Sequence, residues 1–570
     1  MPFIPHVSRK TLHHRNPEAR NFVAWPMVDN LFDYTAMLSD SKPIATVPRA
    51  LWGSRVGIVG AGAAGMVAAY ELFRAGLNPV IFEATGRIGG RNYSEPFGGQ
   101  MGRNAALAEL GAMRVPPSCK VFFYYAGLLG MQFSAFPDPG KVPTTLYYEN
   151  DCYQWRPGQP APGPFAQIAA DFGNFSDGLT GAVWGPWKAG DMEGVRRVWQ
   201  RYIARYSNIS FLTALAEGIP AWGPAELNAF GALGMGSGGF GSLYGVGFLE
   251  LLRVMVNQWE IDQQLPQFGI NELTTQLFRR KVKRPDGPMS SLSDLDTLHL
   301  NCPVTKIERR GARVTVHYTG PDGGAHDTFP AVIVATTSHA MAFLGLTLPS
   351  SPKAGAKPIL SAGVSAALRN LPMMNSSKLF IRTKNKFWKG DPAMPQNIQT
   401  DELPRGVYCL DYPQTKNGVV LISYTWGDDS TRLIGCPPKT RFEIFKTILS
   451  RIHPRFAAQL VPVDGEIINI DWETTNHYFG AFKLEQPGQG PDVQEAYYQF
   501  LDVLTPSRDS GVYIAGDSIS WAGGWTEGAL QTGLNAAAAA AKRIGATLPA
   551  NSPLSQRKDL YDYGGSLTND

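Results

Sequence analysis

A glycine-rich turn near the start of the chain constrains the fold more than any other feature. The sequence from Arg55 reads RVGIVGAGAAGMVAAYELFRAGLNPVIFE. Its apolar residues predict a strand over Val56–Val59, a helix over Met66–Arg74 and a second strand over Pro79–Glu83. Strand, turn, helix and strand within about 30 residues form a βαβ unit, which is typical of an α/β fold with a Rossmann-like domain.

The turn has the glycine spacing of a dinucleotide-binding fingerprint. Gly60 permits a tight turn, Gly62 lets the backbone approach a pyrophosphate, and Gly65 lets the helix pack on the strand. Glu83 ends the second strand, where a carboxylate accepts hydrogen bonds from both ribose hydroxyls and disfavours the 2′-phosphate of NADP. The turn alone does not distinguish FAD from NAD.

Length and composition indicate a multidomain protein without a nucleic-acid partner. The chain has 570 residues, of which 44% are hydrophobic and 18% charged, and its formal net charge is +4. This length exceeds the usual size of one domain, so we expect two or three domains. A charge of +4 with only short basic runs does not favour binding to nucleic acid.

Cysteine usage and hydropathy favour a cytoplasmic protein without a metal. The five cysteines are widely spaced and odd in number, which favours reduced thiols. Neither they nor the nine scattered histidines form a metal-binding pattern. We expect neither a signal peptide nor a membrane span, because no run of about 18 apolar residues occurs.

The continuation EATGRIGGRN separates the two candidate cofactors. The pattern E-x-x-x-R-x-G-G-R is matched at Glu83, Arg87, Gly89, Gly90 and Arg91. The stretch thereby resembles the second fingerprint of the flavin amine oxidase superfamily. The resemblance implies FAD as the cofactor, with the glycines close to its diphosphate and Arg91 neutralising that charge.

A second motif lies near the C-terminal end. GVYIAGDSISWAGGWTEG resembles the last FAD motif of the same superfamily, between a predicted strand over Val512–Ala515 and a predicted helix over Thr526–Ile544. The resemblance implies that Asp517 lies near the ribityl chain and that Trp525 lies against the flavin ring. The positive end of the helix dipole would face the flavin's carbonyl edge and stabilise negative charge on the reduced ring.

The two motifs imply one cofactor site built from distant segments. AVIVATT resembles a strand that returns to the FAD domain, and Val304 in CPVTKI resembles a residue whose backbone meets the adenine. The expected cofactor-binding residues are Gly60, Gly62, Ala64, Gly65, Glu83, Ala84, Gly90, Arg91, Met113, Arg114, Val304, Gly516, Asp517, Trp525 and Thr526.

We expect three interleaved domains. They are a Rossmann-like FAD-binding domain of the amine oxidase type (51–115, 285–345 and 500–548), a mixed-sheet substrate domain (116–160 and 346–499) and a mainly helical subdomain (161–284). Residues 1–50 are expected to form an irregular arm on the surface, and residues 549–570 a tail.

Six further stretches narrow the resemblance. They are ELGAMRVPPS, FPDPGKVPTTLYY, LGMGSGGFGSLYGVGFLELLR, NSSKLFIRTKNKFW, SYTWGDDSTRL and GAFKL. They resemble the bacterial tryptophan 2-monooxygenase group, which also includes phenylalanine oxidase, lysine monooxygenase and related L-amino-acid oxidases. This resemblance implies oxidation of the α-amino group of an L-amino acid by hydride transfer to FAD, with O2 as the final acceptor.

The resemblance implies roles for the catalytic residues. Arg114 would bind the substrate carboxylate, for which a guanidinium fork is well suited, and Tyr424 would add a hydroxyl to it. Lys378 would assist the reaction with O2, because a positive charge stabilises superoxide as it forms. The Gly524 carbonyl would accept a hydrogen bond from an N–H of the substrate, and Trp525 would hold the substrate against the flavin ring.

The substrate side chain is less constrained. We expect an apolar pocket for an aromatic or large side chain, lined by Phe240, Tyr244, Trp472 and Trp521. Trp521 departs from the smaller aromatic residue expected in the tryptophan enzymes. A basic substrate such as arginine or lysine is the alternative, and the acids that could approach it are Glu473, Glu495 and Asp502.

Several alternatives concern the reaction itself. We expect a monooxygenase that gives an amide; the alternative is an oxidase that gives a 2-oxo acid, ammonia and peroxide. An NAD-dependent dehydrogenase would leave RIGGR and AGGWTEG unexplained, and a flavin-binding redox sensor would leave Arg114, Tyr424 and Lys378 unexplained. The expected partners are an L-amino acid and O2, without nucleic acid or membrane, in a homodimer.

Overall fold

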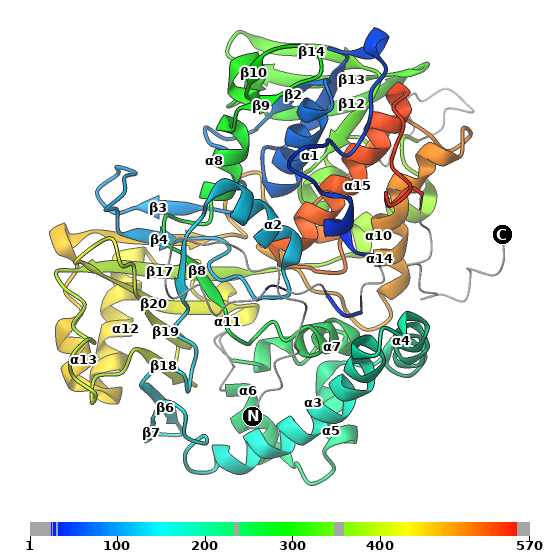
Figure 1. Ribbon diagram of the computed structural model, residues 1–570. Coiled ribbons are helices and arrows are strands. Elements are labelled where there is room, and N and C mark those ends of the chain that lie inside the picture. The colour runs from blue at the N-terminus through cyan, green and yellow to red at the C-terminus, as the bar shows by residue number, and fades with distance from the viewer. Residues whose placement is uncertain (1–23, 25–26, 30–31, 233–238, 347–357, 556–570) are drawn as a thin grey trace.

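A five-stranded parallel sheet organises the upper part of the molecule (Figure 1). The computed structural model describes residues 24, 27–29, 32–232, 239–346 and 358–555. The strands of this sheet, in spatial order, are β11 (Leu298–His299), β2 (Asn78–Phe82), β1 (Arg55–Val59), β15 (Val332–Val334) and β23 (Val512–Ile514). The predicted βαβ unit is confirmed, because α1 (Ala63–Arg74) joins β1 to the adjacent parallel strand β2.

Two helices pack against each other beside this sheet. The predicted helix α15 (Thr526–Ile544) is confirmed, and its alanine run Ala536–Ala541 is buried along its whole length. Small residues allow α15 to approach α1 closely: a Cβ on Gly533 would lie 2.5 Å from the carbonyl oxygen of Ala64. The pair brings the N-terminal ends of both helices to the same region as the glycine turn.

Further elements extend this layer. The antiparallel strands are β12 (Val304–Arg310), β13 (Arg313–Gly320) and β14 (Gly323–Phe329). The helices are α2 (Lys120–Leu129), α8 (Glu272–Arg279), α9 (Ser338–Ala342), α10 (Ala362–Asn370) and α14 (Gly490–Tyr497). Their apolar side chains share two cores with the parallel sheet, although our predicted domain bounds assign several of them elsewhere.

A seven-stranded mixed sheet forms a second layer. Its order is β21 (Ile467–Asp471), β17 (Ser376–Thr383), β20 (Gly418–Trp426), β19 (Gly406–Leu410), β18 (Asn397–Thr400), β6 (Thr144–Tyr148) and β7 (Asp151–Trp155). Only β18 and β6 pair in parallel. Helices α11 (Asp428–Thr431), α12 (Pro438–Ile452) and α13 (Pro454–Gln459) accompany it.

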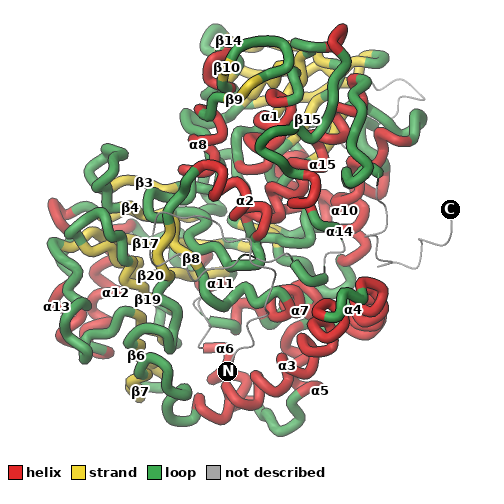
Figure 2. The backbone as a smooth tube through the Cα atoms, in the orientation of Figure 1, coloured by secondary structure: helices red, strands yellow, loops and turns green. Residues whose placement is uncertain are grey.

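A group of helices occupies the opposite end of the molecule from the parallel sheet (Figure 2). They are α3 (Phe165–Lys188), α4 (Met192–Tyr206), α5 (Phe211–Gly218), α6 (Pro224–Ala232) and α7 (Phe248–Val256). An aromatic-rich core of their own holds them together. α4 begins at the cap Asp191, whose side chain accepts from the N–H of Gly194, which satisfies one of the free donors of a helix start.

Short elements complete the chain. The strand pairs are β3 (Ser94–Pro96) with β4 (Leu107–Glu109), β5 (Phe133–Ala135) with β8 (Gln264–Pro266), β9 (Val282–Lys283) with β10 (Met289–Ser290), and β16 (Met373–Met374) with β22 (Phe482–Lys483). The 3₁₀ helices are Tyr34–Met37, Arg49–Leu51, Gly241–Leu243, Leu292–Leu295, Val463–Gly465, Tyr498–Leu504 and Asp517–Ile519. Within the described ranges, no helix combines the length and the apolar character needed to cross a bilayer.

The described part of the N-terminal arm corrects one expectation. We expected residues 1–50 to lie on the surface, yet Met27, Val28, Phe32 and Ile44 are buried. The Tyr34 hydroxyl lies 2.6 Å from that of Tyr497 and donates to Asn535. The composition of the first fifty residues did not reveal this burial, because a minority of apolar side chains among prolines and polar residues is enough to anchor a segment on α15.

Candidate active site

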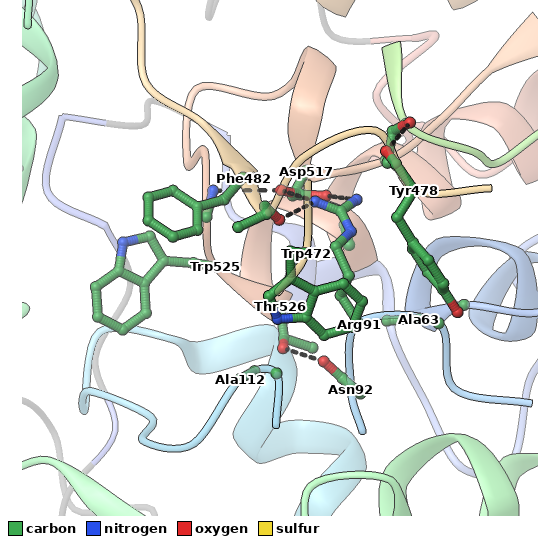
Figure 3. Close-up of a pocket in the computed structure, with 18 of the residues that line it drawn as sticks. Ala63, Arg91, Asn92, Ala112, Trp472, Tyr478, Phe482, Asp517, Trp525 and Thr526 are labelled. Carbon is green, nitrogen blue, oxygen red and sulfur yellow. Dashed lines mark hydrogen bonds and ion pairs between the residues drawn. The ribbon is translucent and has the colours of Figure 1, made fainter. Parts of the chain in front are cut away.

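One cavity of about 350 Å³ brings together most of the predicted site residues (Figure 3). Both FAD motifs line it, as do residues from the mixed sheet and from the helical end. The predicted residues that line the cavity are Gly60, Gly62, Ala64, Glu83, Ala84, Gly90, Arg91, Met113, Arg114, Phe240, Val304, Lys378, Tyr424, Trp472, Gly516, Asp517, Gly524, Trp525 and Thr526.

The glycine turn is closed tightly against its surroundings. Gly60 has φ +99°, and a Cβ on it would lie 2.6 Å from the carbonyl oxygen of Ala335. A Cβ on Gly65 would lie 2.0 Å from the carbonyl oxygen of Gly60, so this glycine packs the helix on the strand instead of lining the cavity. A Cβ on Gly90 would lie 3.0 Å from the Cα of Gly62. The two glycine loops therefore touch, and Gly60, Gly65 and Gly90 leave little or no room for a side chain.

Glu83 is fixed at the end of β2. Its carboxylate accepts hydrogen bonds from the backbone N–H of Ala61 at 2.8 Å and of Thr85 at 2.9 Å, and from the Thr85 hydroxyl at 2.8 Å. These donors orient the carboxylate at the edge of the cavity, where the fingerprint places the contact with the ribose.

An ion pair joins the two FAD motifs. Arg91 donates to both carboxylate oxygens of Asp517, at 3.0 and 2.5 Å, and also to the Ala481 carbonyl at 2.8 Å. Asp517 accepts a further bond from the Gly524 N–H at 3.3 Å. Figure 3 shows this pair within the cavity lining, with Phe482 and Trp525 together on one side. The pair ties the RIGGR loop to the AGGW loop across 426 positions of sequence.

Arg114 lines the cavity and is only 8% exposed. Its guanidinium lies 3.6 Å from the Glu260 carboxylate and 5.7 Å from the ring centroid of Phe136. Burial raises the pKa of Glu260, and the charge of Arg114 opposes this rise. The sequence analysis missed Glu260, because nothing in the local pattern QWEID indicates that its side chain reaches Arg114.

The mixed sheet presents three predicted residues to the cavity. Lys378 on β17 lies directly opposite Tyr424 on β20, so both side chains share one face of the sheet. The Lys378 amino group donates to the carbonyls of Glu109, at 2.9 Å, and Gly111, at 2.6 Å, and burial lowers its pKa to about 7. Trp472 donates its indole N–H to the Leu110 carbonyl at 2.9 Å. These bonds hold the sheet against the strand β4 and the loop that leads to Arg114.

Another part of the cavity lining is apolar. It contains the predicted residue Phe240 and six residues that the sequence did not predict, which are Leu243, Leu251, Val254, Trp426, Phe482 and Leu484. Trp525 packs against Trp259 with ring centroids 5.2 Å apart. These residues come from three distant segments, so no local spacing could have identified them as one wall.

Two predicted pocket residues lie outside the cavity. Tyr244 donates its hydroxyl to the Leu227 carbonyl and packs inside the helical core. Trp521 lies beside Tyr497, and the Arg253 guanidinium sits 4.8 Å from its ring centroid. The two rings do not line the cavity for one reason: each faces a neighbouring helix, and proximity in sequence to the motifs did not reveal this direction.

The acids considered for a cationic substrate also lie elsewhere. Glu473 accepts from the Ser430 hydroxyl, Glu495 lies against Gly363, and Asp502 is in the segment Tyr498–Leu504. Among the described residues, the acids that line the cavity are Glu83, Asp517 and Glu260. The same ranges contain no group of three or more histidine, cysteine, aspartate or glutamate residues arranged for a metal.

Comparison with known proteins agrees with this architecture. Putrescine oxidase has a similar structure, with a TM-score of 0.64 and 17% identity, over 85% of this chain and 98% of that one. Cyclohexylamine oxidase from Brevibacterium oxydans IH-35A gives a TM-score of 0.63 and 18% identity, over 86% and 99%. At this identity the two structures support the fold, an α/β amine oxidase fold with a parallel and a mixed sheet.

Sequence comparison identifies the family. The chain is 36% identical to tryptophan 2-monooxygenase of Pseudomonas savastanoi over 94% of this chain and 99% of that protein. It is 35% identical to tryptophan 2-monooxygenase of Pantoea agglomerans pv. gypsophilae, over 95% and 98%, and 24% identical to a phenylalanine 2-monooxygenase precursor of Pseudomonas sp, over 87% and 88%. Residues 63–541 match the family model described as flavin containing amine oxidoreductase. The chain therefore belongs to the flavin-containing amine oxidoreductases, which confirms the resemblance read from its motifs.

Proposed function

We propose that this protein is an FAD-dependent L-amino-acid monooxygenase that converts an amino acid with an aromatic or large apolar side chain to the amide, with O2 as co-substrate. The observation that carries the proposal is the cavity's substrate end, where a buried arginine faces a wall of apolar side chains. The relatives named tryptophan 2-monooxygenase, similar over nearly their whole length, support the same chemistry.

The residues of the nucleotide end fit FAD. Because Gly62 and Gly90 have no side chains, their backbone N–H groups would be accessible to a diphosphate, and the N-terminus of α1 points to the same place. Arg91 supplies a cation, Glu83 an oriented carboxylate for the ribose, and the N-terminus of α15 at Thr526 a positive dipole end. When bound, FAD supplies the acceptor for the hydride from the substrate's α-carbon.

The substrate end fits an amino acid. Arg114 offers a permanently charged fork to the carboxylate, and burial strengthens that interaction because little water competes for it. Tyr424 lines the same region and offers a hydroxyl. Phe240, Trp426 and Phe482 receive the side chain by apolar contact, which favours a phenyl or indole group over a cationic one.

Two other groups act near the reacting atoms. Gly524 has φ +78°, which favours glycine, and it lines the cavity, where its backbone carbonyl would accept an N–H of the substrate. Lys378 holds an amino group whose pKa of about 7 leaves a large charged fraction at neutral pH. In its charged form it stabilises negative charge that develops on O2.

An anaerobic screen of the twenty L-amino acids tests the proposal. We expect tryptophan, phenylalanine or another large apolar amino acid to bleach the visible absorbance of the flavin, and lysine and arginine to leave it unchanged. Mass spectrometry of the aerobic products then separates the amide from the 2-oxo acid.

Each other outcome has a definite meaning. Bleaching by no amino acid would refute the proposed function altogether. Bleaching by lysine or arginine alone would replace the apolar substrate with a basic one, and a 2-oxo acid product with peroxide would make the protein an oxidase.

A further inference from the structure

Glu260 is the acid in the cavity that the proposed function leaves without a role. It lies 3.6 Å from Arg114, the group proposed to bind the substrate carboxylate. The other acids of the described cavity lining, Glu83 and Asp517, are at the nucleotide end and already accept several hydrogen bonds. Among the described residues, Glu260 has no comparable set of hydrogen-bond donors, and it lies beside Arg114.

The segment that carries Glu260 contacts both of the groups proposed to bind an amino acid, or their immediate neighbours. Its neighbour Trp259 packs on Trp525, which precedes α15, while Glu260 itself reaches Arg114. A substrate with its carboxylate on Arg114 would therefore bind beside the Glu260 carboxylate, which lies 3.6 Å from that guanidinium. The backbone here is strained, because Gln258 and Asp262 have φ of +55° and +52°, as often occurs at functional sites.

Arg114 already has acidic neighbours before the substrate arrives. Besides Glu260, the buried Asp138 interacts electrostatically with Arg114, and burial raises the pKa of Asp138 to about 7. A substrate carboxylate adds a further negative charge to this low-dielectric site, and like charges in one site favour protonation of one of them. Asp138 does not line the cavity, so Glu260 is the acid that can exchange a proton with the substrate.

We propose that Glu260 is the base that takes the proton from the substrate's α-ammonium group, so that a neutral amine is present for hydride transfer. The substrate carboxylate takes the place of Glu260 on Arg114. One proton moves from the ammonium nitrogen to a carboxylate oxygen of Glu260, which leaves a neutral amine and a neutral carboxylic acid without any transfer of electrons. This inference rests on the proposed function, because it concerns the substrate of that same site.

The other titratable groups near Glu260 do not serve this role. Tyr408 and Tyr424 are buried with raised pKa values, so they stay protonated at neutral pH. Lys378 donates to two backbone carbonyls on the sheet, and Lys141 pairs with Asp262 at the surface. Arg114 keeps its proton throughout.

The first test is the pH profile of flavin reduction in anaerobic stopped-flow experiments, with the best amino acid from the screen. In Glu260→Gln the rate of reduction should fall about 10²-fold at pH 7, the usual size of a general-base effect. It should then rise about tenfold per pH unit, because only substrate that is already neutral reacts. Wild type and the control Asp262→Asn, an exposed carboxylate two positions away, should stay fast and nearly flat over this range.

The second test needs no turnover. Calorimetry of flavin-loaded protein with 3-phenylpropionate, which has a carboxylate and a phenyl ring but no amine, is run at pH 8 in two buffers of different ionisation enthalpy. Wild type should take up about one proton per ligand, because Glu260 leaves Arg114 and becomes protonated. Glu260→Gln should bind the ligand at least as tightly and take up none.

Several results would overturn the inference. One is a pH profile of Glu260→Gln that runs parallel to that of wild type. Another is proton uptake that persists in this variant. A third is the absence of proton uptake by wild type, which can be measured even if the variant does not fold. If the substitution of Glu260 changed flavin reduction only with lysine or arginine as substrate, Glu260 would contact the substrate side chain instead of the α-amino group. If no amino acid bleaches wild type, the proposed function has failed, whereas bleaching with an unchanged variant refutes only the role of Glu260.

Discussion

Arg114 carries a charge that the fold has removed from water. A buried guanidinium is tolerated only where acids and rings surround it, here Glu260 at 3.6 Å and the ring of Phe136. Its sequence neighbours Met113 and Val115 are also buried, as their apolar character indicated. In the proposed function, the substrate carboxylate takes the place of Glu260 on this guanidinium.

Replacement of Arg114 tests this reading at the residue scale. We expect Arg114→Ala to lower kcat/KM for the best amino acid by about 10²- to 10³-fold, because the substrate carboxylate loses a charged partner. Arg114→Lys should recover only part of this loss, because an ammonium lacks the planar fork. Steady-state kinetics normalised to bound flavin make the comparison, with the exposed Arg201→Ala on α4 as the control. An unchanged KM in Arg114→Ala would contradict the assigned role.

At the scale of elements, the contact of α1 with α15 links stability to the cofactor site. Both helices are buried on nearly all sides and meet through small residues. Gly533 is the tightest point, since a Cβ there would lie 2.5 Å from the Ala64 carbonyl oxygen and 2.6 Å from Val67. Ala64 itself lines the cavity, so a shift of α1 at this point moves the glycine turn.

A pair of matched substitutions checks this packing. Gly533→Ala should lower the free energy of unfolding by about 1–3 kcal/mol through overpacking, and should weaken retention of flavin. Gly178→Ala on α3 makes the same chemical change in a helix where no atom lies within 4 Å of the new Cβ. That variant should gain up to about 1 kcal/mol from helix propensity. Thermal unfolding measures both, and equal effects of the two changes would show that packing at Gly533 does not matter.

At the scale of the whole molecule, a buried ionic network joins distant segments behind the active site. Arg253 on α7 contacts Asp29 at 3.3 Å and Glu485 at 3.4 Å, while Lys483 on β22 contacts Glu250 at 2.9 Å and Glu485 at 3.7 Å. A Cβ on Gly523 would lie 2.5 Å from Lys483, so the network also supports the AGGW loop. It fastens the N-terminal segment, the helical end and the last FAD motif to one another.

Removal of one partner should be costly and dependent on pH. Lys483→Met should lower the free energy of unfolding by about 3–5 kcal/mol, because it leaves buried carboxylates without their cation. Burial raises the pKa of Glu250 to about 7 in the folded state, and Lys483 limits that rise. Because the pKa of Glu250 is higher in the folded than in the unfolded state, the protein loses stability as the pH rises from the unfolded pKa to the folded pKa. Without Lys483 the folded pKa of Glu250 is higher still, so this loss continues above pH 7. The difference in unfolding free energy between wild type and Lys483→Met therefore widens as the pH rises.

The comparison uses denaturant unfolding at pH 6 and pH 9. Lys141→Met, which removes an exposed ion pair with Asp262, is the control and should cost less than about 1 kcal/mol at either pH. The double variant Glu250→Gln with Lys483→Met should recover part of the stability and lose most of the pH dependence. A deficit in Lys483→Met that is independent of pH would argue against Glu250 as its source.

Much of the fold and the nucleotide end of the site could be predicted from sequence. The bounds of α15 were correct and the βαβ unit was present, although α1 begins at Ala63 and not at Met66, because the spacing of apolar residues encodes these elements locally. The glycine positions followed from close backbone approach, which no other residue permits. Domain bounds, the homodimer and the cytoplasmic location stay predictions.

The substrate end was decided only by the tertiary structure. Which face a side chain presents depends on packing between segments far apart in sequence. Trp426, Phe482 and Glu260 were therefore missed, and the predicted residues Tyr244 and Trp521 do not line the cavity. The sequence by itself therefore determined the cofactor fold, because backbone-level requirements leave local patterns. The tertiary structure alone decided what surrounds Arg114, because that depends on where three distant segments meet.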